Sequence, residues 1–390
     1  MKILYHHRIA SKDGQYVHVE EIIKALRGRG HEVVVVEPGS INQKKFGQSS
    51  SLVEKIRTHV PGFIHELAEF AYSLLDFCRL SAAITRHRPD VIYERYNLYL
   101  PSGIWASKCF GLPLLLEVNS PLYEERKRHG HISMPLLANW TETYVWRHAD
   151  RALPVTAVLA KRMADKGVNP RKISVIPNGV NRSQFAENSD ASPLAQQLGI
   201  EGKTVLGFTG FVRDWHRLDR VLEVLRENPE QNWHFMIVGD GPACSELARQ
   251  ASSMGIADKI TFTGVVDRAD INRYVDCFDI ALQPDVVDYA SPLKLFEYLA
   301  MAKPVLAPDK PNIREVLTHG RTALLFDVEN GNDFRDKLLQ LCQSAELRQS
   351  LSHSARALLD ERGYYWDENA ARIERLFEHC LESGKMSENP

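Results

Sequence analysis

The chain has 390 residues, of which 44% are hydrophobic and 25% are charged. This length exceeds one ordinary core and predicts two domains of roughly 150 to 200 residues each, while the composition excludes disordered and fibrous classes. Because 48 Lys and Arg nearly balance 50 Asp and Glu, we exclude a nucleic-acid partner bound through bulk positive charge.

Cysteine spacing and hydropathy bear on metal sites and location. The six cysteines show no CxxC spacing and no nearby histidine pattern, which predicts reduced thiols and no metal site. The start, MKILYHHRIA, lacks the apolar core of a signal peptide. No apolar stretch reaches the roughly 18 to 20 residues that span a bilayer. We therefore expect a cytoplasmic protein, able to contact the inner face of a membrane peripherally.

In the first half, short runs of Val, Ile and Leu alternate with longer amphipathic stretches. This alternation predicts a parallel sheet covered by helices on both faces. The first strand is followed by a loop in which Gly14 precedes a helix, and we expect His18 on that helix's surface. The candidate strands are residues 2–5, 32–36, 91–93, 113–117, 151–154 and 173–176.

Residues 43–84 interrupt the alternation with an apolar-rich segment broken by a Pro-Gly pair, which predicts two helices. Four basic residues lie near its start: Lys44, Lys45, Lys55 and Arg57. Two interpretations stay open. We favour helices that cover the N-terminal sheet, the commoner role of an apolar stripe. The alternative is an interfacial surface that meets anionic lipid and a lipid-linked acceptor.

Polar side chains follow two of the predicted strands, in the runs IYERYN and LEVNSPLYEER. Such groups are costly to bury after an apolar strand unless they are hydrogen-bonded or used. Recognition of acceptor hydroxyls and structural hydrogen bonding are equally consistent with them. The residues concerned are Glu94, Arg95, Asn97, Glu117 and Asn119.

A polar stretch at 178–203 predicts an interdomain linker that contains a short helix. The alternation then restarts, so both halves are predicted to be doubly wound. Ligands of such sheets bind beyond the carboxyl ends of the strands, and we expect the two ligands to face each other. The second set of candidate strands is 204–209, 233–238, 260–263, 280–283, 304–307 and 323–326.

The second half opens with VLGFTGFVRDWHRLDR, a strand that ends at Gly210 before a loop and a helix. This arrangement lets a diphosphate approach the backbone closely. We expect Arg213 to clamp phosphate, because a guanidinium grips two oxygens and the largely neutral imidazole of His216 cannot. An exposed loop arginine is the alternative. No Walker-type GxxxxGK[ST] occurs, which argues against an ATPase.

The stretch SPLKLFEYLAMAKPVLAP contains the strongest candidates for ligand-binding residues in the sequence. Ser291 is a good N-cap and Pro292 suits the first helical position, so a helix is predicted to begin there. Its free amide groups, with the ammonium of Lys294, would face a phosphate. Glu297 lies one turn further on the same face, where ribose hydroxyls would sit. From the residues alone, a solvated Lys294–Glu297 ion pair is an equally good interpretation.

These stretches resemble the donor signature of the retaining GT-B glycosyltransferases classed as family four, most densely at residues 206–327. The resemblance implies an α/β fold of two Rossmann-like domains facing a cleft. It implies an acceptor-binding domain at 1–185 and a donor-binding domain at 186–364, with the last helix, 365–390, joining the first domain.

The resemblance also assigns roles to residues of this sequence. Lys294 would contact the donor phosphates and Glu297 the nucleotide ribose, while Arg213 and Lys294 would form the catalytic pair. The remaining donor contacts implied are Gly14, Gly210, His216, Val265, Val266, Asp288, Tyr289, Ser291, Pro292 and Leu293. The acceptor contacts that we expect come from the two polar runs described above and not from the resemblance: Glu94, Arg95, Asn97 and Asn119.

Among the departures of this sequence from the family, two bear on whether the protein is active. Tyr289, preceded by Asp288, stands where the family has its first glutamate, which is often assigned to the transferred sugar. Phe211 stands at the position of the family's arginine.

The activity implied is transfer of a sugar from a nucleoside diphosphate to the hydroxyl of a carbohydrate, lipid-linked or small-molecule acceptor. Retention, assembly of bacterial-type polysaccharide or glycolipid, and the absence of metal and cofactor are implied with it. The two departures leave room for a non-catalytic nucleotide-sugar-binding subunit. A sugar-nucleotide epimerase of the same fold is a further alternative.

Overall fold

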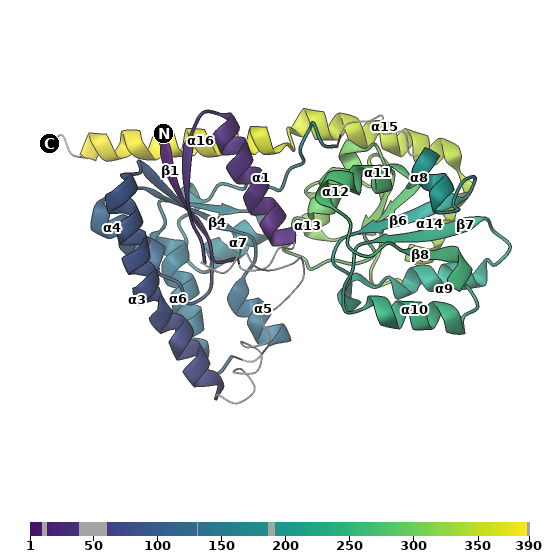
Figure 1. Ribbon diagram of the computed structural model, residues 1–390, viewed down its shortest axis with the longest axis horizontal. Helices are drawn as coiled ribbons and strands as arrows, with labels where there is room; N and C mark the ends of the chain where they lie inside the picture. Colours follow the sequence, from purple (N-terminus) through teal and green to yellow (C-terminus); the bar gives the residue numbers. More distant parts are fainter. Residues whose placement is uncertain (10–13, 39–60, 131, 186–191, 388–390) are drawn as a thin grey trace. The chain divides into compact units, whose positions relative to one another are not determined.

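The computed structural model describes residues 1–9, 14–38, 61–130, 132–185 and 192–387. The chain forms two compact units (Figure 1), which we call unit 1, Met1–Pro177 with Trp366–Pro390, and unit 2, Asn178–Tyr365. The division thus falls after Pro177, upstream of residue 185. The reason is that Val180 and Phe185, two apolar residues of the polar stretch, are buried in the core of unit 2.

Unit 1 is built on a five-stranded parallel sheet of order β2-β1-β3-β4-β5. The predicted sixth strand at 173–176 is wrong: Ile173 forms an isolated bridge with Ala152. This segment bonds to one neighbour, through Ser174 N to Ala152 O, and stays partly exposed. The strands are β1 (Lys2–His6), β2 (Glu32–Val36), β3 (Val91–Arg95), β4 (Leu114–Val118) and β5 (Arg151–Pro154).

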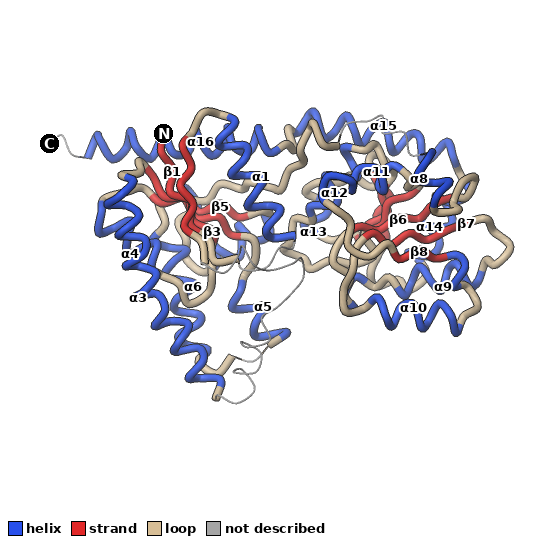
Figure 2. The backbone as a smooth tube through the Cα atoms, in the orientation of Figure 1, coloured by secondary structure: helices blue, strands red, loops and turns tan. Residues whose placement is uncertain are grey.

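Helices lie on both faces of this sheet (Figure 2), and within the unit α1 packs on α16 and α3 on α4. Of the two helices predicted in 43–84, one is described, α3, which begins directly after Pro61. Lys44, Lys45, Lys55 and Arg57 lie outside the described residues. The helices are α1 (Gly14–Gly28), α3 (Gly62–His87), α4 (Ser102–Phe110), α5 (Leu122–His129), α6 (Pro135–His148), α7 (Ala157–Asp165) and α16 (Trp366–Ser387).

Unit 2 contains a six-stranded parallel sheet of order β11-β10-β9-β6-β7-β8. The strand order reverses between β6 and β9, and ligands of such sheets bind at that switch point, beyond the carboxyl ends of the strands. The strands are β6 (Thr204–Thr209), β7 (Trp233–Val238), β8 (Ile260–Phe262), β9 (Ile280–Leu282), β10 (Val305–Pro308) and β11 (Ala323–Phe326).

Both faces of this second sheet are buried under helices. Met236 and Ile237, neighbours in β7, belong to different apolar clusters, as the alternation of side chains along a strand requires. The helices are α8 (Ser192–Gln197), α9 (Asp219–Glu227), α10 (Cys244–Ser253), α11 (Ile271–Asp276), α12 (Leu293–Ala300), α13 (Pro311–Arg314), α14 (Asp333–Gln343) and α15 (Ala345–Arg362). Among the described residues, no helix is both long enough and apolar enough to cross a bilayer.

Candidate functional site

The start of α12 lies beside the switch point of unit 2, one residue later than predicted. The helix begins at Leu293 with Pro292 as its N-cap, so the prediction that Ser291 caps it is wrong. The Ser291 hydroxyl instead accepts a hydrogen bond from the Asn178 backbone N–H at 3.2 Å, and its carbonyl accepts one from the Asn178 amide at 2.5 Å. Ser291 therefore fixes the loop before α12 rather than the helix's first amides.

Lys294, in the first turn of α12, reaches toward the end of β6. Its ammonium lies 3.7 Å from the centre of the Phe208 ring, and a Cβ built on Gly210 would stand 3.2 Å from Nζ. Among the described residues, this ammonium has no hydrogen-bond or ion-pair partner. Burial lowers the pKa of Lys294 to about 7, although the Glu297 carboxylate opposes the shift. A desolvated cation at a strand end is a strong attractor for an anion.

Two tight turns bring backbone together at this edge of the sheet. Gly210 and Gly239 have φ values of +126° and +133°, which side chains rarely adopt. A Cβ on Gly239 would overlap the Gly210 carbonyl oxygen, and one on Gly241 would overlap that of Val212. The structure shows two loops in backbone contact directly under Lys294.

Arg213 and His216 flank the same turn. The Arg213 guanidinium lies 4.7 Å from the ring centres of both Phe211 and Trp215, and the Arg213 side chain is exposed. Phe211, which stands at the position of the family's arginine, therefore makes a cation–π contact with the Arg213 guanidinium. Burial lowers the pKa of His216 to about 2, and the charges of Lys294 and Arg213 add to the shift. His216 is thus a neutral imidazole, and its Nδ1 accepts from the Arg213 backbone N–H at 3.2 Å.

Glu297 is buried, with 5% of its surface exposed, and its carboxylate is paired with Arg268 rather than with Lys294. The interpretation of Lys294 and Glu297 as a solvated ion pair is therefore wrong. Arg268 also packs over the Phe185 ring at 5.1 Å. Sequence reasoning missed Arg268. The sequence contained little indication of it, because Arg268 is a single basic residue a few positions after the glycine that follows a predicted strand, Gly264.

Asp288 and Tyr289 lie in the loop between β9 and α12, and Tyr289 is 5% exposed. Two side chains from beyond β10 hold this loop. The Lys310 ammonium contacts the Asp285 carboxylate and the Val286 carbonyl, each at 2.6 Å. The Asn312 amide donates to the carbonyls of Val287 and Ala290 at 3.0 and 2.7 Å. The loop is thereby fixed at the carboxyl edge of the sheet.

Val265 and Val266 follow β8 at the same edge. Gly264, with a left-handed φ of +69°, forms a backbone bridge with Gly239. Val265 is half exposed, at 52%, whereas Val266 packs against the apolar core of the unit. The structure thus gathers Gly210, Arg213, His216, Lys294 and Glu297 with this turn on one edge of one sheet.

The predicted acceptor residues of unit 1 form buried hydrogen-bond networks. Glu117 is the centre of one: it accepts from Tyr93 Oη at 2.9 Å, from Arg95 and Asn119 at 2.5 Å each, and lies 3.0 Å from His18 Nε2. His18 is 5% exposed, so its predicted place on the helix surface is wrong. The charges of His18 and Arg95 hold the pKa of Glu117 well below its usual range despite burial, which opposes the shift.

Glu94 belongs to a second buried network in unit 1. Its Oε2 lies 2.8 Å from His6 Nδ1, while Asp76 Oδ2 lies 3.0 Å from His6 Nε2. Burial disfavours the imidazolium, yet these two carboxylates raise the pKa of His6 to about 10. Asn97 follows β3 and is partly exposed, and Gly14 begins α1. Structural hydrogen bonding therefore accounts for the contacts of Glu94 and Arg95.

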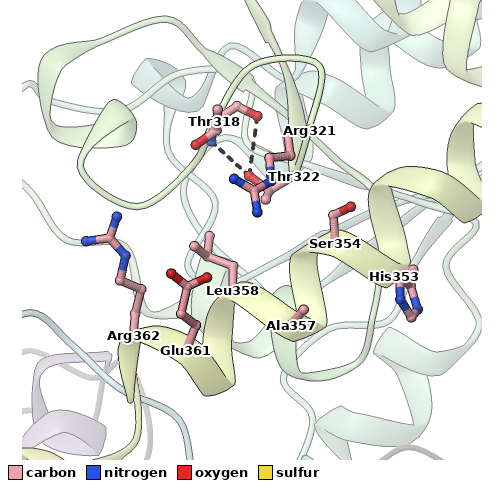
Figure 3. A pocket seen from close by; sticks show the side chains of 9 residues that line it. All are labelled: Thr318, Arg321, Thr322, His353, Ser354, Ala357, Leu358, Glu361 and Arg362. Carbon is pink, nitrogen blue, oxygen red and sulfur yellow. Dashed lines mark hydrogen bonds between the residues drawn. The ribbon is translucent and has the colours of Figure 1, made fainter.

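A cavity of unit 2 lies elsewhere, between the segment before β11 and α15 (Figure 3). Arg321 and Thr322 line it from that segment, and His353 and Glu361 from α15. Thr322 directly precedes β11, so this cavity is at the amino edge of the sheet, opposite Lys294. Within the described part of the chain, no group of three His, Cys, Asp or Glu side chains is placed to hold a metal.

Comparison with known proteins covers both halves of the chain. The family described as Glycosyltransferase Family 4 matches residues 12–184, and the family described as Glycosyl transferases group 1 matches residues 203–344. The GDP-mannose-dependent alpha-mannosyltransferase of Mycobacterium tuberculosis is 25% identical over 80% of this chain and 79% of its own length. The D-inositol 3-phosphate glycosyltransferase of Thermobispora bispora is 24% identical over 95% and 90%.

Solved structures agree in fold. Anabaena Alr3699/HepE in complex with UDP and glucose superposes with a TM-score of 0.77 at 19% identity, over 97% of this chain and all of that one. Sucrose-phosphate synthase from Thermosynechococcus elongatus also gives 0.77, at 14% identity, over 98% of this chain and all of that one. Both match across the two units, so the predicted fold class is confirmed.

Proposed function

Since the chain belongs to the GT-B glycosyltransferases of family 4, with a group 1 domain in its second half, we propose that it transfers a sugar from a nucleoside diphosphate sugar to an acceptor hydroxyl, with retention at the anomeric carbon. The acceptor proposed is a carbohydrate, a lipid-linked sugar or a small molecule of bacterial-type polysaccharide or glycolipid assembly. The relatives above fit this class, because one is named for its use of GDP-mannose and a structural neighbour was solved with UDP and glucose.

The observation that carries the proposal is the ammonium of Lys294. It lies in the first turn of α12, against the glycine turn at the switch point, and has no hydrogen-bond or ion-pair partner among the described residues. A helix start supplies further positive potential there. Gly210 has no side chain, which leaves the backbone open to close approach. A diphosphate is the ligand that this combination fits.

The proposed reaction places charge on the departing diphosphate. Lys294 and the α12 amides would stabilise that charge without reorganising solvent, the kind of preorganisation that contributes most in enzymes. Arg213, exposed and held over two rings, would close on the phosphates from the other side. In the proposed route the leaving phosphate takes the proton of the attacking hydroxyl on the same face of the sugar, so retention needs no protein nucleophile, metal or cofactor.

The nucleoside would occupy the far side of the same edge. Glu297 would bind the ribose through the oxygen that Arg268 leaves available, since a carboxylate accepts from vicinal hydroxyls. The half-exposed Val265 would contact the base. The loop with Asp288 and Tyr289 would meet the sugar, and Tyr289 stands there at the position for which the family resemblance implies a glutamate.

Thermal unfolding with a panel of nucleotide sugars tests this assignment. Because ligand binding to the native state raises the melting temperature, at least one nucleotide sugar should stabilise the wild type. Lys294→Met and Glu297→Gln should lose that stabilisation, each measured against its own ligand-free melting temperature. Arg249→Ala, which removes an exposed cation from α10, should keep it. A panel that stabilises the two site variants as much as the wild type would overturn the assignment.

Retention is tested separately, by proton NMR of the product formed from the stabilising donor. An anomeric coupling that matches the donor supports the proposed stereochemistry, and the opposite anomer contradicts it. A donor that binds but never turns over, with any acceptor offered, favours the non-catalytic binding subunit over the transferase.

A further inference from the structure

Helix α3 has an inverted distribution of polar and apolar side chains. Its buried residues include Glu66, Ser73 and Asp76, whereas Leu74 and Leu75 are 63% and 65% exposed. A helix of a globular protein normally turns its apolar stripe to the core. The outward stripe runs along most of the helix and consists of Phe63, Ile64, Leu67, Ala68, Ala71, Leu74, Leu75, Cys78 and Ala82.

Three inward polar side chains of α3, those of Glu66, Ser73 and Asp76, are hydrogen-bonded, and these bonds fix the orientation of the helix. Glu66 accepts from Tyr99 Oη at 2.9 Å and from the backbone N–H groups of Ser133 and Met134 at 2.6 and 2.7 Å. Ser73 donates to a backbone carbonyl at 2.7 Å, and Asp76 accepts from a serine hydroxyl at 2.6 Å. Rotating the helix to bury its leucines would leave buried donors and acceptors without partners, which would strongly destabilise the folded protein.

Helix α6 continues the same surface. The Phe70 ring of α3 contacts Trp140 of α6, with ring centres 6.1 Å apart, and Trp140 stacks on Tyr144 at 5.4 Å. Leu136, one turn before Trp140, is 87% exposed. We call the outward stripe of α3 together with Leu136, Trp140 and Tyr144 the apolar face. The apolar face is a contiguous patch, whereas exposed hydrophobic residues on the surface of a soluble monomer are normally scattered singly.

The charges around the apolar face have one sign. In α3, α4 and α6, all of whose residues are described, no exposed side chain is acidic: each carboxylate is buried or paired, whereas arginine, lysine and histidine side chains are exposed. Arg86 continues the stripe at the end of α3, and the Lys108 ammonium lies 5.3 Å from the centre of the Tyr144 ring. Cations flanking Leu, Trp and Tyr are typical of helices that lie in the interface of an anionic membrane.

We propose that the apolar face of unit 1 binds the surface of a bilayer that contains anionic phospholipid, with α3 and α6 lying in the plane of the interface. A second copy of the chain fits less well, because a two-fold contact through this face would bring like charges together. A bilayer with negative headgroups instead pairs with those cations while its acyl region covers the leucines.

Cosedimentation of the full chain with vesicles tests the proposal. The protein should bind vesicles of phosphatidylcholine with phosphatidylglycerol, and more weakly those of phosphatidylcholine alone. Leu74→Glu should lower the partition coefficient by at least about tenfold, because it replaces a buried apolar contact with a charge. Arg86→Gln and Lys108→Gln should each lower it by about fivefold on the anionic vesicles. Val175→Glu changes an apolar residue of unit 1 that is 38% exposed and lies in the segment beside β5, outside the apolar face, so this control variant should bind like the wild type.

Sedimentation velocity without lipid and donor-induced thermal stabilisation complete the test. A wild-type dimer that Leu74→Glu converts to a monomer, together with no vesicle binding, would assign the face to a second copy and overturn the proposal. Binding that is equal on both kinds of vesicle and unchanged in Leu74→Glu would also overturn it. Since Leu74 belongs to unit 1 and the proposed donor residues Lys294 and Glu297 belong to unit 2, donor stabilisation should persist in Leu74→Glu, so failure here is distinct from failure of the proposed transferase function.

Discussion

Lys294 is the residue on which the proposed donor site depends, and its protonation state should control the affinity for the donor. In the ligand-free protein its pKa is lowered to about 7, so the ammonium predominates below that pH and the neutral amine above it. Only the ammonium attracts a diphosphate. The dissociation constant should therefore be flat below about pH 7 and rise by about tenfold per unit above it, until the pKa of the bound state is reached.

Calorimetric titration of the stabilising nucleotide sugar between about pH 6 and pH 9 measures this dependence. His216 stays neutral across the range, since its pKa is about 2, so it adds no titration of its own. Lys294→Met should bind about tenfold or more weakly, the usual loss for one charge-assisted hydrogen bond, and should show no such pH dependence. A wild-type affinity that is constant over the range would contradict the assigned role of Lys294.

Some residue-level features were predictable and others were not. Lys294 and Gly210 were singled out because a cation in the first turn of a helix and a glycine after a strand have local signatures. The Arg268–Glu297 pair and the Asn178–Ser291 hydrogen bonds join positions far apart in the chain. Such partners are set by the fold. The Asn178 contact also explains why the predicted N-cap was one residue early.

At the scale of elements, the turn after β7 supports the edge of the sheet where donor binding is proposed. Gly239 has φ +133° and lies against the Gly210 carbonyl. Gly239→Ala should therefore displace the Gly210 turn and cost about 1–3 kcal/mol of stability, with a marked loss of donor affinity by calorimetry. Gly255 also has a positive φ, +71°, but faces open space. Gly255→Ala should lose stability alone. Wild-type affinity in Gly239→Ala would show that the turn does not support the site.

Strands were the elements that the sequence predicted best. Runs such as Trp233–Val238 are buried on both faces, and their continuous apolar character marks them. The segment at 173–176 is also mostly apolar. It bonds to a single neighbouring strand, however, and so it forms an isolated bridge instead of a strand. Helix α3 was detected as apolar, whereas the direction in which its apolar stripe faces follows from the buried partners of Glu66 and Asp76.

The whole molecule consists of two doubly wound units, and a different role is proposed for each: donor binding for unit 2 and membrane binding for unit 1. The donor residues proposed after α8 lie along the carboxyl edge of the sheet of unit 2, which includes the switch point where the strand order reverses between β6 and β9. Unit 1 presents the apolar face and the networks of Glu94 and Glu117. The alternation of strands and helices predicted this architecture. It did not predict the boundary at Pro177, because two buried side chains, Val180 and Phe185, decide it.

The most direct test of the account is the rate at which the purified protein releases nucleoside diphosphate from the stabilising donor in the presence of acceptor. Lys294→Met should lower kcat by about 10²- to 10³-fold, the range seen when one preorganised charge-stabilising group is removed. Arg249→Ala should turn over like the wild type. A Lys294→Met variant that releases the diphosphate at the wild-type rate would contradict the central claim.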